Sequence, residues 1–337
     1  MNTKETKKPN PILNKDKIIF EQEDSIAGIE SVFSFKDGDL LVFQNKFSII
    51  YDGKTFNKKL KLDFLGASCA FCYLSEKEFI LLKDFYFSLY RFDKNRTNFK
   101  EIYTVDKNKY QETNKKIFNL SNNNLISLAE IYFTPVIKVF GRIEDNYELI
   151  ENHNLKDIDE VINLENDEFL TIKKFMNQDY ILLKVYNNKD YIVNRKNEIK
   201  CILNGKRRIY FSDLPILKVD KNKILIGGIM FLNIICTETL QLETTIKISP
   251  QIKSLRLLGN NCIIFIETLK NFKEIKYNLT RVWINFIMND IIKKESIDIT
   301  EEMGEFKTLF CIHNYMDKGL ATIGDQYQLK IYENLVD

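Results

Sequence analysis

Six cysteines and two histidines are the side chains of this sequence best suited to metal or redox chemistry. Cys69 and Cys72 have the Cys-x-x-Cys spacing of a redox pair or of half a zinc site. They lie in an apolar stretch that predicts a β-strand, where residues three apart point to opposite faces. No second cysteine pair lies nearby in the sequence. We therefore interpret the pair as two buried, inert thiols, with a metal site as the alternative.

The histidines and the acidic clusters form no catalytic pattern. His153 and His313 are isolated from each other, and we expect both on turns or at the surface. Asp37-Gly-Asp39 and Asp157-Ile-Asp159-Glu160 do not continue into the twelve-residue spacing of an EF-hand loop, so we interpret them as turn and capping carboxylates. The sequence contains no nucleophile elbow, zinc-protease helix, P-loop or dinucleotide fingerprint. We expect no enzymatic activity, no metal and no cofactor.

The stretch from residue 204 to residue 211 holds the strongest candidates for binding. It brings a lysine and two of the few arginines next to two aromatic residues: Lys206, Arg207, Arg208, Tyr210 and Phe211. Arginine and aromatic side chains are typical anchors of protein interfaces. We predict that these five residues contact a protein partner. The alternatives are a solvated loop with an apolar foot and a phosphoinositide site, for which only the arginine doublet matches.

Composition limits the class of protein and of partner. The chain has 337 residues, of which 45% are hydrophobic and 28% charged, as in a globular domain. The formal net charge of +2 argues against nucleic acid as a partner. No export signal and no apolar run of about 18 residues is present, so we expect a cytoplasmic protein without membrane insertion. Residues 1–17 carry almost nothing to bury and predict a disordered tail, followed by one domain from 18 to 337.

Short apolar runs separated by Asp-Gly and Asn-rich turns predict β-strands in groups of four. Seven such units follow one another, and the centres of their third strands are Ile49, Leu89, Lys138, Leu183, Ile234, Val282 and Leu329. The steps of about 40 to 50 residues are typical of propeller repeats, in which each unit is one blade. The seventh unit has only three strands. We expect Ile18 to Glu23 to supply its fourth and to close the ring, which removes exposed sheet edges.

Two segments carry a resemblance to a known family. Residues 323–332, which read Ile-Gly-Asp-Gln-Tyr-Gln-Leu-Lys-Ile-Tyr, resemble the end of a WD repeat with Tyr332 in place of the usual tryptophan. Residues 136–140 match the last positions of the same ending. Residues 18–334 thus resemble a divergent WD-repeat propeller, which implies an all-β, seven-bladed β-propeller. The sequence has one tryptophan, Trp283, and no Gly-His pair, so we expect apolar packing rather than the family's buried polar network to hold the blades.

Fold and composition together favour one function over another. We predict a non-catalytic scaffold for protein–protein interaction within a larger assembly. The alternative is a propeller with a small-ligand or catalytic site at the mouth of its central channel, which needs convergent polar groups there.

Overall fold

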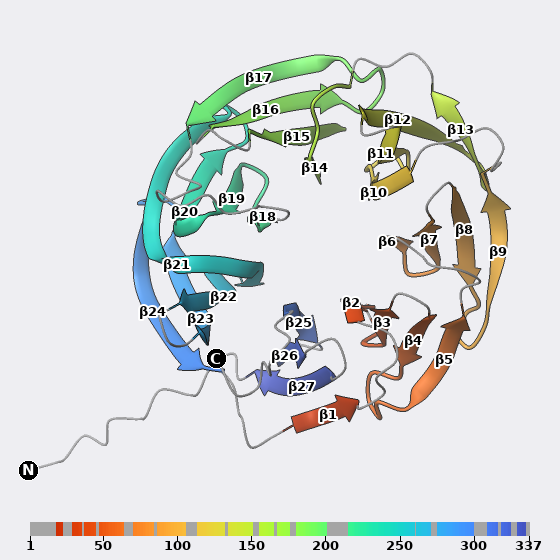
Figure 1. Ribbon diagram of the computed structural model, residues 1–337, viewed down its shortest axis with the longest axis horizontal. Helices are drawn as coiled ribbons and strands as arrows, with labels where there is room; N and C mark the ends of the chain where they lie inside the picture. The colour runs from red at the N-terminus through yellow and green to blue at the C-terminus, as the bar shows by residue number, and fades with distance from the viewer. Residues whose placement is uncertain are drawn as a thin grey trace, which may run out of the picture.

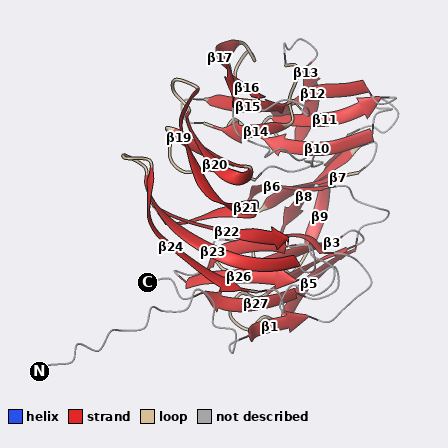
Figure 2. Cartoon of the chain, turned by 60° about the vertical axis from the view of Figure 1, so that its left-hand side comes forward, coloured by secondary structure: helices blue, strands red, loops and turns tan. Residues whose placement is uncertain are grey.

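The computed structural model describes most of the chain. The described residues are 18–22, 29–35, 37–44, 47–63, 70–83, 86–105, 113–131, 134–150, 155–164, 167–175, 180–200, 215–259, 261–270, 275–299, 309–315, 318–324 and 329–334. Their regular structure consists of β-strands joined by turns and loops (Figure 2). Among them there is no helix with the length and apolar character needed to cross a membrane.

Four sheets of four antiparallel strands follow one another along the chain. The first sheet comprises β2 (Ile29–Ser34), β3 (Leu40–Gln44), β4 (Phe47–Tyr51) and β5 (Lys58–Asp63). The second comprises β6 (Ala70–Ser75), β7 (Glu78–Leu82), β8 (Phe87–Phe92) and β9 (Phe99–Thr104). The third comprises β10 (Thr113–Asn119), β11 (Leu125–Ile131), β12 (Thr134–Ile143) and β13 (Asn146–Ile150). The fourth comprises β14 (Glu160–Asn163), β15 (Glu168–Lys174), β16 (Tyr180–Asn187) and β17 (Val193–Lys200).

Two further sheets complete the described fold. A seven-stranded sheet comprises β18 (Ile216–Lys218), β19 (Lys223–Gly227), β20 (Ile229–Cys236), β21 (Gln241–Gly259), β22 (Cys262–Lys270), β23 (Ile275–Asn285) and β24 (Asp290–Asp298). The last sheet has the order β1-β27-β26-β25 and comprises β1 (Ile18–Gln22), β25 (Leu309–Tyr315), β26 (Lys318–Gly324) and β27 (Leu329–Asn334). The predicted grouping of strands in fours therefore holds everywhere except at β21.

β21 is one continuous strand where the sequence predicts two. Its first part pairs with β20, as in the register of Cys236 with Gln241. Its second part pairs with β22, beginning with Ile252 opposite Glu267. Pro250 lies where the ladder changes partner, and a proline without an N–H group is tolerated where no ladder bond has to be donated. The extended proline lets the strand continue, so that β18 to β24 form one seven-stranded sheet.

The pairing predicted for the N-terminal strand is present. β1 lies antiparallel to β27, with Ile18 opposite Tyr332 and Gln22 opposite Leu329. The first strand of the chain thus supplies the outer strand of the last sheet, which the C-terminal segment alone would leave with three strands.

The sheets are arranged around a common centre (Figure 1). Strands β2, β6, β10, β14, β18 and β25 lie innermost, and β1, β5, β9, β13, β17 and β24 lie outermost. The long strand β21 runs from the outside toward the centre. Inner strands of neighbouring sheets contact each other: β6 contacts β10, β21 contacts β25, and β25 contacts β2 near the two ends of the chain.

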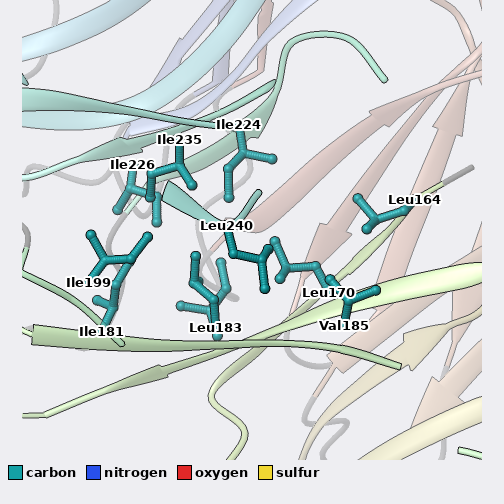
Figure 3. Close-up of a cluster of buried hydrophobic side chains, with 11 residues drawn as sticks. Leu164, Leu170, Ile181, Leu183, Val185, Ile199, Ile224, Ile226, Ile235 and Leu240 are labelled. Atoms are coloured by element: carbon teal, nitrogen blue, oxygen red, sulfur yellow. The ribbon is translucent and has the colours of Figure 1, made fainter. Parts of the chain in front are cut away.

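Apolar side chains fill the space between the faces of neighbouring sheets. One cluster joins the fourth sheet to β19 and β20 through residues that include Leu170, Leu183 and Ile226, all with no exposed surface (Figure 3). A second cluster, rich in phenylalanine, joins the first two sheets around Phe79. Full burial of one such side chain contributes about 1.5–3 kcal/mol. The expectation that apolar packing holds the sheets together is confirmed for these clusters.

Candidate functional site

The turns at one end of each sheet are the most elaborate part of the described fold. Antiparallel strands alternate in direction, so the turn between the first and second strands and the turn between the third and fourth leave from the same end. We call this end the paired-turn face. The third-to-fourth turns contain residues with a left-handed backbone, among them Arg96 (φ 53°), Tyr191 (φ 58°) and Leu240 (φ 53°). All three side chains are buried, and Arg96 and Tyr191 bond to the preceding sheet.

Arg96 joins the second sheet to the first. Its side chain is 8% exposed, and its Nη1 pairs with Asp37 and, at 3.1 Å, with Asp39. Its Nη2 lies 2.7 Å from Glu76 Oε2, and its guanidinium carbon lies 4.1 Å from the ring centre of Phe35. The carboxylates of Asp37-Gly-Asp39 therefore serve a turn, as predicted, and also neutralise a buried cation that the sequence did not reveal.

The next two seams, where the second sheet meets the third and the third meets the fourth, are also bridged at the paired-turn face. At the second-to-third seam, Arg91 Nη2 lies 2.5 Å from Asp145 Oδ1 and Arg142 Nη2 lies 2.9 Å from Glu78 Oε2. At the third-to-fourth seam, the Asn188 amide donates to Ser121 Oγ at 2.5 Å. The same seam is bridged by the Asn124 amide, which donates to the Tyr191 hydroxyl at 2.8 Å.

Within the seven-stranded sheet, the junction of its two halves is bridged as well. Lys223 Nζ donates to the carbonyl oxygen of Phe286 and lies 2.7 Å from Glu243 Oε2. The Asn289 amide donates to Glu243 at 3.2 Å. The two parts of the seven-stranded sheet are therefore also joined by hydrogen bonds and an ion pair.

The seam between the fourth sheet and β18–β20 is bridged by the Asn197 amide, which donates to the Leu240 carbonyl oxygen at 2.7 Å, and it also contains a cavity. Its volume is about 300 Å³, and it is lined by Leu164, Glu168, Arg195, Lys221, Asn222, Thr237 and Glu238. Its walls are fixed by backbone bonds, since the Thr237 N–H donates to Asn222 O at 2.7 Å and the Thr237 hydroxyl to Lys221 O at 3.0 Å. Because Arg195 belongs to the outer strand β17, the cavity lies away from the centre of the ring.

Charges on the fourth-sheet wall of this cavity are already paired with each other. Arg195 Nη2 lies 2.7 Å from Glu168 Oε2, and Arg195 Nη1 donates to Oε1 at 3.3 Å. The Asn194 amide also donates to Glu168 Oε1, at 2.8 Å. The Nε–H of Arg195 is enclosed by the protein without an acceptor, so a ligand can reach only the Nη groups.

Apolar side chains are exposed at several turns of the paired-turn face. In the β23–β24 turn, Ile287 is 92% exposed and Met288 is 70% exposed. Ile143 ends β12 and is 52% exposed, and Ile192, next to β17, is 54% exposed. Asn285 Oδ1 accepts the N–H groups of Ile287 and Met288 at 3.0 and 3.1 Å, which holds the turn that displays them.

The structure locates only some of the residues singled out from the sequence. Lys206, Arg207, Arg208, Tyr210 and Phe211 lie outside the described residues, in the connection between β17 and β18. Cys69 and His153 also lie outside them, and His313 lies on β25.

Of the cysteine pair, only Cys72 is described. It is buried, and burial raises the pKa of its thiol to about 12, which makes it unreactive as predicted. Within the described residues no group of three or more metal-ligating side chains comes together.

The cavity was not predicted from the sequence, because its lining residues come from separate segments of the chain that have the composition of ordinary strands and turns. One feature of the sequence relates to the cavity. Arg195 lies in the polar stretch 193–200, which forms strand β17 although it contains few apolar residues. An outermost strand has one face toward solvent, so it needs few apolar side chains. From the sequence alone this strand is expected at Glu198 to Leu203, whereas in the structure it begins at Val193.

Comparisons with known proteins give the class of fold. No family model and no curated protein matches the chain. A chain of the crystal structure of the mitotic checkpoint complex is similar in fold, with a TM-score of 0.64 and 10% identity over 100% of this chain and 97% of that one. The computationally designed Ika8 protein matches with a TM-score of 0.53 and 12% identity, over 92% of this chain and 98% of its own. This protein has a propeller-like all-β fold.

Proposed function

We propose that this protein is a non-catalytic scaffold, a closed seven-bladed propeller that binds other proteins within a larger assembly. The blade count follows from dividing the seven-stranded sheet at β21, whose two parts serve as the last strand of one blade and the first strand of the next. Closure of the ring rests on the pairing of β1 with β27 and on the contact between β25 and β2. The likeness to a chain of the mitotic checkpoint complex, itself an assembly of proteins, supports the proposal.

The observation that carries the proposal is the apolar pair Ile287 and Met288, 92% and 70% exposed at one turn. Burial of an isoleucine or methionine side chain contributes about 1.5–3 kcal/mol. A fixed turn presents these side chains without a large ordering cost on association. Contiguous exposed apolar surface marks interaction sites, and these two side chains are adjacent in one turn.

The test compares a double variant with a matched control. We expect the wild-type protein, affinity-purified from its own cells, to bring down defined partners, and the variant Ile287→Ser with Met288→Ser to lose at least one of them. Phe175→Ser is the control, because Phe175 follows β15 at the opposite end of its sheet and is 38% exposed. A wild-type protein that runs only as a free monomer under several purification conditions would refute the scaffold function.

The five residues of the β17–β18 connection form a second predicted contact in this proposal. We expect Arg207→Ser with Arg208→Ser to weaken partner binding separately from the Ile287 and Met288 variant. Unchanged recovery of every partner would remove Arg207 and Arg208 from the binding surface.

A further inference from the structure

The seam beside Arg195 combines a direct bond with a cavity. The Asn197 amide donates across it to the Leu240 carbonyl oxygen at 2.7 Å, as Arg96 and Asn188 bond across other seams, and the cavity lies in the same seam. At the cavity, Glu168 and Arg195 bond to each other on one wall, and Lys221 and Glu238 stand on the other. Within the described part of the chain, Lys221 and Glu238 have no ion pair.

The cavity retains hydrogen-bond donors on Arg195 and Lys221 and acceptors on Glu238. Glu168 already accepts three hydrogen bonds, from Asn194 and from both Nη atoms of Arg195. The side chain of Arg195 is 38% exposed and retains further N–H groups, since a guanidinium carries five. Lys221 is exposed and adds up to three donors from its ammonium group. A carboxylate is the ligand group that these donors fit, and a guanidinium–carboxylate pair is the stronger kind of hydrogen bond.

We propose that this cavity binds the acidic side chain of a partner polypeptide, which deepens the proposed scaffold function and rests on it. A polypeptide fits better than a free anion because Glu238, at the same cavity, would repel an anion but can accept a backbone N–H of a peptide. Ile192, three residues before Arg195 in the sequence, is 54% exposed and provides a methyl group by which binding can be followed. The volume of about 300 Å³ holds one acidic side chain and is at the lower limit of ligand pockets.

The experiment uses a matched pair of small probes on the full chain. N-acetylglutamate α-amide carries the carboxylate and a peptide N–H, and N-acetylglutamine α-amide is its neutral isostere. Binding is followed through the isoleucine methyl resonances, in particular that of Ile192. We expect a saturable shift with the glutamate probe and at least tenfold weaker binding of the glutamine probe.

Variants then assign the binding to the cavity. Lys221→Met should weaken the glutamate probe about tenfold, and Glu238→Gln should not weaken it. Lys94→Met is the control, because Lys94 is an exposed lysine at a turn of the same face in the second sheet. Both lysines are exposed, so the melting temperatures of the two variants should match the wild type.

Three results would overturn the proposal: equal binding of the two probes, no binding of either, or full binding by Lys221→Met. Inorganic phosphate that binds as tightly as the glutamate probe would also overturn it, because the cavity would then be a site for free anions. A different result would refute the scaffold function: no partner is recovered with the wild-type chain from its own cells. If partners are recovered equally by wild type and Lys221→Met, the scaffold stands and the cavity proposal falls.

Discussion

Replacement of Arg96 by methionine tests whether one buried cation holds the first two sheets together. Its side chain is 8% exposed and meets three carboxylates of the neighbouring turns. Asp39 is the critical one, since its side chain is only 5% exposed and would keep Lys59, at 2.7 Å, as its charged partner. Methionine keeps the apolar part of the side chain but removes the charge, the N–H donors and the guanidinium that lies over the Phe35 ring.

The expected cost follows from the burial of each partner. Removing one member of a fully buried ion pair costs about 3–5 kcal/mol. Asp37 and Glu76 are 55% and 30% exposed, so their pairs contribute little, and Lys59 still compensates Asp39. We therefore expect a loss of about 2–3 kcal/mol for Arg96→Met. An unfolding entropy of ~2.1 cal/mol/K per residue over 337 residues corresponds to ~0.7 kcal/mol/K, so the midpoint should fall by about 3–4 °C.

The control is the same substitution at a half-buried arginine of the same sheet. Arg91 also pairs with two carboxylates, Glu78 at 2.6 Å and Asp145 at 2.5 Å, but its side chain is 32% exposed. Its pair with the exposed Asp145 is worth about 0–1 kcal/mol, and Glu78 keeps Arg142 at 2.9 Å, so Arg91→Met should shift the thermal midpoint by about 1 °C or less. Equal melting of the two variants, followed by circular dichroism, would refute the reasoning that burial makes Arg96 different.

The stability of the wild type and of Arg96→Met at acid pH provides a second test. Burial of Asp37 by itself raises its pKa, but the hydrogen bonds from Arg96 and from the Asp39 N–H outweigh it and hold the pKa below its ordinary value of 3.8. A carboxyl with a lowered pKa in the folded state stabilises the protein above its unfolded pKa and loses this effect as pH falls through the folded one. The stability gap between wild type and Arg96→Met should therefore narrow below about pH 4.

Two further predictions test the packing at β21 and the closure of the ring. A Cβ at Gly227 would lie 2.7 Å from the Pro215 ring, whereas one at Gly141 would meet only the Ile150 side chain, at 3.2 Å. Gly227→Ala should therefore cost about 1–3 kcal/mol in urea unfolding, and more than Gly141→Ala. Deletion of residues 1–24 should remove the ladder between β1 and β27, about four hydrogen bonds or roughly 2–6 kcal/mol, whereas deletion of residues 1–16 should cost almost nothing. Identical melting of both truncations and the full chain would contradict closure by β1.

The strand order could be read from the sequence because its signals are local. Apolar runs and Asp-Gly turns fix each hairpin, and the three-stranded remainder at the C-terminus leaves one position for β1. Arg96 and Asp39, by contrast, are 57 residues apart, and no local pattern joins them. The lining of the cavity has the same origin, since Arg195 and Glu238 meet only because two sheets pack face to face.

The seams nevertheless follow a rule that a sequence can reveal once the fold is known. Four of the third-to-fourth turns begin with Asp52, Asp93, Asn187 and Asn285, whose side-chain oxygens accept N–H groups two to four residues later. A residue with positive φ follows each of them three or four positions on, and among these Arg96, Tyr191 and Asn289 bond to the preceding unit. The same turn geometry is therefore repeated from sheet to sheet, while the residue at the positive-φ position differs. This freedom allows one seam to carry an ion pair and another an amide network, without any change in the arrangement of the sheets.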